Sequence, residues 1–360
     1  MVFIKNLKQY LSAVIKHNTM KKLSFINKII YFINVVFAIL LLLSYVLPFT
    51  PPKTFSVLSV LSLGVPFLIL SNTLFFLYWL IKLKKQMILS FVILLVGYIS
   101  FGSLYKFTSS KSNENAQNLK VMNYNVRLFN LYKWIAEDSI ENNIVDFIKA
   151  ESPEILSIQE YHPHINVDLS FFKHKYEKLS GKKTKYGQAI FSQYPIINSG
   201  SIEFLNTSNN AIFVDVVKGV DTLRIYNVHL ESMRINTETE SLKKENSERL
   251  FNRVGTTFKM QQSQTELFLK HKKQCSYKMI ICGDFNNTAF SYIYRKIKGD
   301  LNDTFKEAGN GFGRTYDFKF FPIRIDFILS DDAFSINEFK TYIEHYSDHY
   351  PIMATLNLED

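Results

Sequence analysis

Acidic residues and arginine are missing from the first 108 residues of the 360-residue chain, although eleven lysines lie there. The chain has 42 lysines and arginines in all, so 31 remain for residues 109–360, against all 32 aspartates and glutamates. The net charge of that larger part is therefore −1, and the formal charge of +10 belongs to the N-terminal third. This distribution gives no support to a generally basic, nucleic-acid-binding surface on residues 109–360.

Cysteine is scarce as well, since Cys275 and Cys282 are the only two in the chain. They do not form a pair with zinc-site spacing, and the sequence contains no His-Glu-x-x-His motif. A Gly-x-Ser-x-Gly elbow and a P-loop are also absent, which argues against serine-hydrolase and P-loop chemistry. Cys282 lies in an apolar run, so a buried free thiol is the expected state.

Three long uncharged stretches follow one another in the N-terminal third. Each is long enough for the about 20 residues that cross the hydrocarbon core of a bilayer. A signal peptide, the alternative, is one short apolar block, so the pattern favours a membrane anchor at 1–108. We expect three transmembrane helices, near residues 29–47, 55–80 and 87–105.

The placement of lysine predicts the orientation of this anchor. Six lysines precede residue 29 and three lie at 82–85, whereas the turn at 48–54 contains one. The positive-inside rule then puts the N-terminus in the cytoplasm, and three spans put the rest of the chain outside a bacterial-type cytoplasmic membrane. Residues 1–26 are amphipathic and rich in lysine, so they either lie on the cytoplasmic face or form a disordered basic tail.

A polar linker at 109–118 separates the anchor from a soluble domain at 119–360. Many short strands and few helices favour a layered α/β (α+β) sandwich over a doubly wound sheet. The polar stretch at 231–256 predicts either a mobile excursion near a site or a surface insertion. The expected strands are 121–126, 155–160, 176–179, 188–192, 201–205, 211–217, 223–229, 278–282, 325–329 and 353–358, and the expected helices are 140–149 and 257–271.

Polar side chains stand where several apolar runs are expected to end. Glu160 is a hard oxygen donor that suits Mg²⁺, and Asn125 could complete the shell of the cation or hydrogen-bond another ligand. Asp284 and Asn286 are two residues apart, so they point to the same side of an extended chain. Asn286 could hold a phosphate oxygen, and Asp284 could orient the nucleophile or assist the leaving group.

Two histidines extend this set of candidates. His349 is expected to be the general base, with Asp326 fixing its tautomer and stabilising its protonated form. Asp348 could bind the metal, and His229 could donate to a phosphoryl oxygen. Each residue alone is also common in a surface turn, but together they provide the charge neutralisation, base and donors that hydrolysis of a phosphate ester requires.

Seven short motifs occur in the order Met122–Arg127, Gln159–Glu160, Tyr186–Ser192, Asn227–Leu230, Gly283–Asn286, Arg324–Phe327 and Ser347–His349. This ordered set, which covers nearly all of 119–358, resembles the endonuclease/exonuclease/phosphatase superfamily. The resemblance implies a four-layer sandwich of two central mixed sheets flanked by helices, with Mg²⁺ or Mn²⁺ as cofactor. It implies metal contacts by Glu160, Asn125 and Asp348, and catalytic roles for His349, Asp326, Asp284, Asn286 and His229.

One position departs from the resemblance, because some nucleases of the superfamily carry an acidic residue where this chain has Arg127. A second metal ligand is therefore absent there. The expected function is a membrane-tethered, metal-dependent phosphodiesterase acting on nucleic acid or a phospholipid headgroup, with no obligate protein partner evident. The alternative is a non-catalytic membrane scaffold that retains the fold, which predicts the loss of at least one catalytic position.

Overall fold

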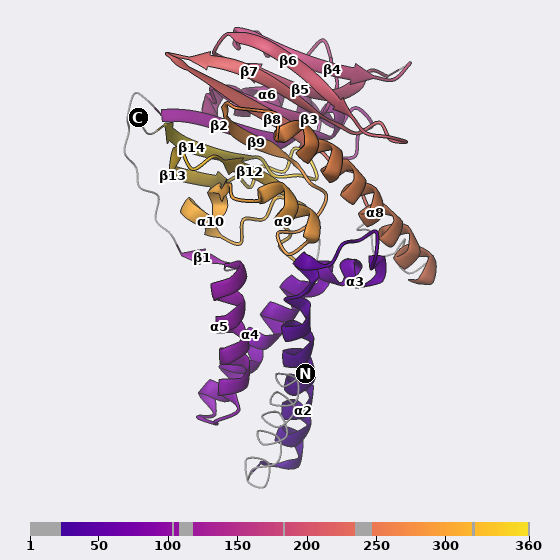
Figure 1. Ribbon diagram of the computed structural model, residues 1–360, viewed down its shortest axis with the longest axis vertical. Helices are drawn as coiled ribbons and strands as arrows, with labels where there is room; N and C mark the ends of the chain where they lie inside the picture. Colours follow the sequence, from indigo (N-terminus) through magenta and orange to yellow (C-terminus); the bar gives the residue numbers. More distant parts are fainter. Residues whose placement is uncertain are drawn as a thin grey trace. The chain divides into compact units, whose positions relative to one another are not determined.

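The computed structural model describes residues 23–102, 104–107, 118–182, 184–234, 247–318 and 321–358. These residues form two compact units (Figure 1). The helical unit comprises Met1–Val46 and Gly64–Leu104, and the sheet unit comprises Leu47–Leu63 and Tyr105–Asp360. The predicted segment at 1–26 and the linker at 109–118 lie mostly outside the described residues, and of the excursion predicted at 231–256 the structure describes 231–234 and 247–256.

Three apolar helices make up the described part of the helical unit: α2 (Phe25–Ser44), α4 (Val65–Ile81) and α5 (Met87–Phe101). By length and composition, two stretches could cross a membrane, Phe25–Phe49 and Ser56–Ile81. The prediction of three such helices was wrong. Helix α5 has only 15 residues, which gives about 22 Å of helix against a hydrocarbon core of about 30 Å.

Buried polar side chains join these three helices to one another. Asn34 of α2 accepts a hydrogen bond from the indole of Trp79 (3.1 Å) and donates to the hydroxyl of Ser90 (2.7 Å). Ser90 of α5 in turn donates to Asn72 of α4 (3.3 Å). All four side chains are fully buried. Such polar contacts fix the register of apolar helices that otherwise have few distinguishing neighbours.

The sheet unit is built on two six-stranded sheets (Figure 1). The first sheet has the strand order β13 (Phe334–Thr341), β14 (Ile352–Leu358), β2 (Asn118–Asn125), β3 (Ile155–Tyr161), β5 (Tyr186–Ser192), β4 (His174–Ser180). The second sheet has the order β10 (Asn302–Asp303), β12 (Asp326–Ser330), β9 (Lys278–Asp284), β8 (Asp221–His229), β7 (Asn210–Lys218), β6 (Ile196–Glu203). Only the β2–β3 and β8–β9 pairs are parallel, so both sheets are mixed.

Apolar clusters separate this unit into four layers. Between the sheets, Val121 and Ile155 of the first pack with Ile225 and Ile280 of the second. Helix α6 (Ile140–Glu151) covers the other face of the first sheet. Helices α8 (Ser247–Lys272) and α9 (Tyr292–Lys298) cover the other face of the second. The predicted four-layer α/β sandwich is therefore confirmed.

Several elements differ from those expected. Helix α8 begins at Ser247, ten residues before the predicted start, and α9 and β13 were not predicted. Short elements complete the unit: β1 (Lys106–Phe107), β11 (Asn310–Gly311), α3 (Ser56–Val60), α10 (Thr304–Ala308) and the 3-10 turns η1 (Leu47–Phe49), η2 (Leu61–Gly64) and η3 (Arg127–Asn130).

The segment Leu47–Leu63 belongs to the sheet unit, although it precedes α4 in the chain. Lys53 forms an ion pair with Glu266 of α8, and its backbone N–H donates to the side chain of Gln262 (2.8 Å). Val60 and Leu63 pack against the buried Phe258 of the same helix. The sheet unit thus holds the chain at a point well before β2, the first strand of the two six-stranded sheets.

Candidate active site

On five strands, the row of side chains that faces the other sheet is apolar at one end of the strand and polar at the other. Side chains two residues apart share a face of a strand. On β2, Leu119 and Val121 are followed in the same row by Asn123 and Asn125. The rows on the other four strands run Ile155, Ser157, Gln159 on β3; Ile225, Asn227, His229 on β8; Ile280, Cys282, Asp284 on β9; and Ile328, Asp326 on β12.

Strand pairing brings the polar ends of the second sheet into one row. Asp284 is the register partner of His229 in the parallel β8–β9 pair and of Asp326 in the antiparallel β9–β12 pair. Asp326 begins its strand rather than ending an apolar run as expected, because an antiparallel neighbour of β9 must start at the edge where β9 ends. His349 likewise precedes β14 instead of following a strand.

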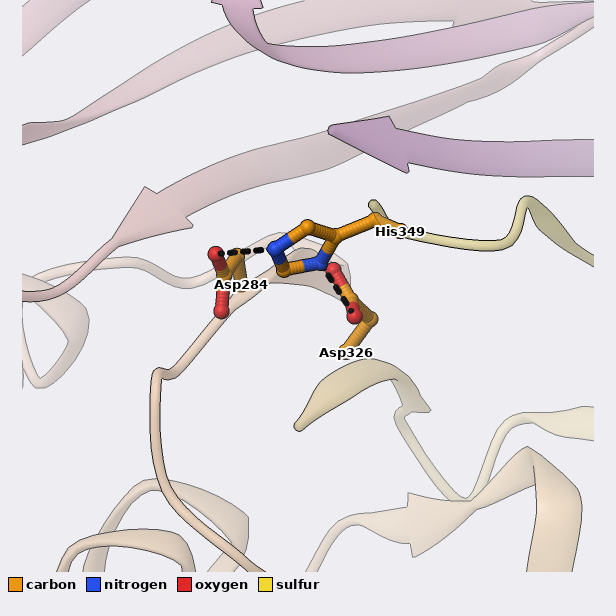
Figure 2. A group of neighbouring side chains, drawn as sticks. All are labelled: Asp284, Asp326 and His349. Atoms are coloured by element: carbon orange, nitrogen blue, oxygen red, sulfur yellow. Dashed lines mark hydrogen bonds and ion pairs between the residues drawn. The ribbon is translucent and has the colours of Figure 1, made fainter. Parts of the chain in front are cut away.

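The imidazole of His349 lies between two buried carboxylates (Figure 2). Its Nδ1 is 2.9 Å from Oδ2 of Asp326, and its Nε2 is 3.7 Å from Oδ2 of Asp284. Burial would lower the pKa of His349, but the charges of Asp326 and Asp284 outweigh it and raise this pKa to about 10. The predicted general base is therefore part of a carboxylate–imidazole–carboxylate group and cannot be treated as a lone histidine.

Asp284 is only 1% exposed and is surrounded by donors. It accepts hydrogen bonds from the Asn125 amide (3.1 Å), from the backbone N–H of Asn286 (2.8 Å) and from the Asn286 side chain (3.3 Å). Burial raises the pKa of this carboxyl to about 7, although the nearby His349 opposes the rise. The other hydrogen bond of the Asn286 amide goes to the carbonyl of Leu230 (3.0 Å), so this amide nitrogen is engaged by both Asp284 and Leu230.

His229 completes this edge of the second sheet. Its Nε2 is 3.7 Å from Oδ2 of Asp284, the same oxygen that faces His349. Burial lowers the pKa of His229 to about 3, and the charge of His349 lowers it further. The two histidines therefore differ in protonation. His229 stays neutral, whereas His349 is held between carboxylates that favour its protonated form.

The first sheet contributes a second acidic pair at the same edge. Oε1 of Glu160 lies 3.5 Å from the amide nitrogen of Asn125. Oδ2 of Asp348 forms an ion pair with Nη1 of Arg127 at 3.2 Å. Burial and the neighbouring Asp348 raise the pKa of Glu160. Ser347 donates to the carbonyl of Asn125 (2.8 Å), which fastens the loop before β14 to the end of β2. The structure thus brings all eight predicted residues to one edge of the sandwich.

Two groups in this site have donor sets that suit a divalent cation. The ligand atoms of Asp284, Asp326 and His349 lie within 4.8 Å of one another, and Oδ1 of Asp326 is buried with no hydrogen-bond partner among the described residues. Glu160 and Asp348 repel each other, and a hard cation would remove that repulsion. Both oxygen-rich sets fit Mg²⁺ or Mn²⁺, whereas the resemblance implied metal contacts only by Glu160, Asn125 and Asp348.

Polar residues beneath the site were not predicted. The buried amide of Gln159 on the first sheet donates to Asn123 (2.7 Å) and across to Asn227 on the second sheet (2.6 Å). Asn227 donates back to the carbonyl of Ile158 (2.8 Å). The signal in the sequence is the period of two, since each of these amides stands two residues before or after another polar residue in an apolar strand. They join the two sheets directly below the reacting groups.

The comparisons with known proteins agree with this geometry. Residues 122–349 match the family described as endonuclease/exonuclease/phosphatase. The chain belongs to this family. Its members are phosphoesterases, as the family name indicates. Residues 27–104 match a second family, described as a domain of unknown function (DUF8431). No curated protein sequence matches the chain.

Solved structures share the fold. An endonuclease/exonuclease/phosphatase from Beutenbergia cavernae has a TM-score of 0.52 at 16% identity, covering 68% of this chain and 72% of its own. The human Nocturnin catalytic domain has the same TM-score at 17% identity and covers 68% and 95%. A family member from Bacteroides vulgatus also reaches 0.52 at 17% identity and covers 67% and 99%. At these identities the similarity concerns the sandwich and does not extend to the substrate.

The bridge between the sheets leads to a test of stability. Replacing Gln159 by leucine leaves the side-chain oxygens of Asn123 and Asn227 buried without this donor, so Gln159→Leu is expected to lower the free energy of unfolding by about 1–3 kcal/mol. Chemical denaturation of the full chain in detergent measures the change. Gln193→Leu is the control, because Gln193 is only partly buried and donates to one carbonyl, that of Phe171 (2.9 Å). Equal losses in the two variants would contradict a bridging role.

Proposed function

We propose that the protein is a membrane-tethered, metal-dependent phosphodiesterase that uses water as the nucleophile. The observation that carries the proposal is Asp284, which is buried between two imidazoles and held by the amides of Asn125 and Asn286. A scaffold that had only kept the fold would have no need to bury so many titratable groups together. The substrate is a phosphate ester, either of nucleic acid or of a phospholipid headgroup.

Hydrolysis requires a water molecule to attack phosphorus while the bond from phosphorus to the leaving alcohol breaks. The proton of that water passes to the pair formed by Asp284 and His349, whose facing atoms are 3.7 Å apart, and the leaving alkoxide takes a proton from the same pair to become the alcohol. Asp326 fixes the imidazole through its 2.9 Å contact with Nδ1. His229, kept neutral by burial, can donate one hydrogen bond to a phosphoryl oxygen.

The cation belongs at the carboxylates of this edge. Glu160 and Asp348, with Asn125 beside them, would hold a Mg²⁺ or Mn²⁺ ion, and such an ion when bound neutralises charge on the phosphate. Arg127 lies at 3.2 Å from Asp348 and stacks on the ring of Trp134 at 4.3 Å. The permanent positive charge of Arg127 also neutralises negative charge on the phosphate. Arg127 stands at the position where some nucleases of the superfamily carry an acidic residue.

The apolar helices support a membrane tether. Only 28% of the window in Phe25–Phe49 and 22% of that in Ser56–Ile81 is buried within the protein, so most of their apolar side chains face outward. Exposed apolar surface of this extent is unfavourable in water and favourable in a bilayer. Lysines are concentrated before residue 29 and at 82–85, so the positive-inside rule puts these two segments in the cytoplasm. The turn between the two candidate spans lies in Leu47–Leu63, which belongs to the sheet unit, so we propose that the sheet unit lies outside the cytoplasm.

Removing the imidazole tests the enzymatic proposal. His349→Ala is expected to lower the rate of hydrolysis of bis(p-nitrophenyl) phosphate by at least about a hundredfold, the low end of general acid–base effects. His345→Ala is the matched control, because His345 also contacts an aspartate (Asp317, 2.9 Å) but is exposed. Wild-type and His349→Ala proteins that were equally inactive with Mg²⁺ and Mn²⁺, across nucleic acid and lipid substrates, would favour the scaffold.

Removing one carboxylate tests the cation. Chelation should abolish hydrolysis, and Glu160→Gln is expected to raise the Mg²⁺ concentration for half-maximal rate at least about tenfold. Calorimetric titration of Mg²⁺ into each protein gives a second readout that does not depend on turnover. The control is Glu177→Gln, which removes a carboxylate paired with Lys175 on β4. Unchanged metal binding in Glu160→Gln would remove this residue from the proposed metal site.

Reporter fusions test the orientation. A fusion of alkaline phosphatase after Asp360 should be active and a fusion of green fluorescent protein at the same position should be dark, because the first folds outside the cytoplasm and the second inside. A fusion at the lysine-rich turn 82–85 should give the opposite pattern. A fluorescent C-terminal fusion would reverse the proposed orientation but would leave the enzymatic proposal unchanged.

A further inference from the structure

The segment Leu47–Leu63 of the sheet unit turns large apolar side chains toward the outside. Five of them have exposed fractions between 44% and 57%, and we call them the apolar patch. The patch consists of Phe49, Phe55, Val57, Leu58 and Leu61. The last three follow the spacing i, i+1, i+4 along α3 and η2, so they share one side of these helical turns.

The hydroxyl groups of the same segment point inward. Ser59 and Ser62 are only 2% and 1% exposed. The hydroxyl of Ser59 donates to the carbonyl of Phe55 (3.1 Å), and that of Ser62 donates to the carbonyl of Ser59 (2.7 Å). A surface segment in water has the opposite arrangement, with hydroxyls toward the solvent and leucines toward the core. The inversion indicates that the patch faces an apolar medium.

The inner side of the segment is fixed to the rest of the sheet unit. Val60 and Leu63 pack against Phe258 of α8, and Lys53 forms an ion pair with Glu266 of the same helix. The patch therefore belongs to the surface of the sheet unit and moves with it. Anything that binds the patch positions the whole unit.

Helix α9 places positive charge beside the patch. It contains Arg295, Lys296 and Lys298 and no acidic residue. The guanidinium of Arg295 lies 4.1 Å from the ring centre of Phe49, and both Arg295 and Lys296 are exposed. Basic side chains around an exposed apolar surface are typical of proteins that lie on anionic membranes. A second copy of the chain would instead bring like charges together.

The course of the chain identifies the apolar medium as a bilayer. One candidate span, Phe25–Phe49, ends in this segment, and the other, Ser56–Ile81, begins in it. A bilayer that holds these spans lies within a few residues of the patch on both sides. The patch and the bilayer therefore meet without any further movement of the chain.

We propose that the apolar patch and α9 dock the sheet unit on the surface of the membrane. The patch enters the boundary between headgroups and acyl chains, and the basic side chains of α9 contact anionic headgroups. The proposal rests on the proposed membrane tether and goes beyond it, because a tether alone leaves the sheet unit free to move away from the bilayer.

Fluorescent labels on single cysteines test the docking with the full chain in vesicles of phosphatidylcholine and phosphatidylglycerol. A Cys275→Ser background leaves only the buried Cys282. A nitroxide on the lipid headgroup should quench a label at Lys296→Cys at least about threefold more than one at Val220→Cys, a fully exposed position between β7 and β8. A nitroxide on the acyl chain should quench a label at Leu58→Cys.

Two results of this experiment would overturn the docking. Equal headgroup quenching at Lys296→Cys and Val220→Cys would mean that the sheet unit does not rest on the lipid. A label at Leu58→Cys that is protected from the lipid nitroxide, with energy transfer between donor-labelled and acceptor-labelled chains, would mean that a second copy covers the patch.

Charges introduced into the patch should lift the sheet unit from the membrane. Leu58→Glu combined with Leu61→Glu is expected to lower the headgroup quenching at Lys296→Cys to the level at Val220→Cys, because carboxylates are unfavourable in the acyl boundary and are repelled by anionic lipid. Leu205→Glu is the matched control, since Leu205 is an exposed leucine of the same unit outside the patch.

The substituted leucines are exposed, so the unfolding temperature in detergent should stay unchanged and show that the variants fold. Unchanged quenching in the double variant, or an equal loss in the control, would overturn the role of the patch. The result with the wild-type patch decides the docking in either case.

Lipid composition tests the contribution of α9. In vesicles of phosphatidylcholine alone, the headgroup quenching at Lys296→Cys should fall at least about twofold, because the attraction to anionic headgroups is lost. Equal quenching in the two kinds of vesicle would overturn the proposed contact of α9 with anionic lipid.

Flotation of the vesicles on a density gradient separates this proposal from the proposed tether. A protein that does not float with the vesicles would overturn the tether. A protein that floats but shows equal quenching at Lys296→Cys and Val220→Cys would overturn the docking and leave the tether in place.

Discussion

The negative charge of Asp284, placed between two sheets, is the constraint on which the rest of this site depends. A carboxylate withdrawn from water is strongly unfavourable unless hydrogen bonds and opposite charge replace its hydration. Here the replacements come from different parts of the fold: Asn125 from the first sheet, Asn286 from the turn after β9, and the imidazoles of His229 and His349. Folding and assembly of the site are therefore the same event, because neither sheet alone can accommodate this side chain.

Backbone strain is concentrated around the same edge. Four consecutive residues without glycine, Arg127–Asn130, have positive φ between 42° and 58°, and Glu160 and Asn286 have φ of 51° and 48°. A left-handed conformation is unfavourable by about 1–2 kcal/mol for such residues, so the surrounding contacts must hold it in place. The strained turn directs the Arg127 side chain toward Asp348, and the positive φ of Glu160 coincides with the irregular register between β3 and β5.

Much of this architecture could be predicted from local pattern. Alternating apolar residues located most strands, and the order of short motifs identified the sandwich and the eight polar residues at its edge. Contacts across the sheets could not be predicted, because the pairing of Gln159 with Asn227 spans 68 positions and depends on how the sheets face each other. Strand β13 alternates weakly, and the packing of Val60 and Leu63 on Phe258 of α8 joins positions that lie far apart in the chain, which composition does not reveal.

The attachment of Leu47–Leu63 to the sheet unit also determines how many times the chain passes between the two units. The polypeptide leaves the sheet unit after Leu63 and rejoins it at Tyr105, so both ends of the intervening hairpin, α4 and α5, are fixed to one compact body. The chain therefore passes between the two units three times, after Val46, after Leu63 and after Leu104. Loss of the Lys53–Glu266 contact and of the packing around it would leave a single passage, between Leu104 and Tyr105.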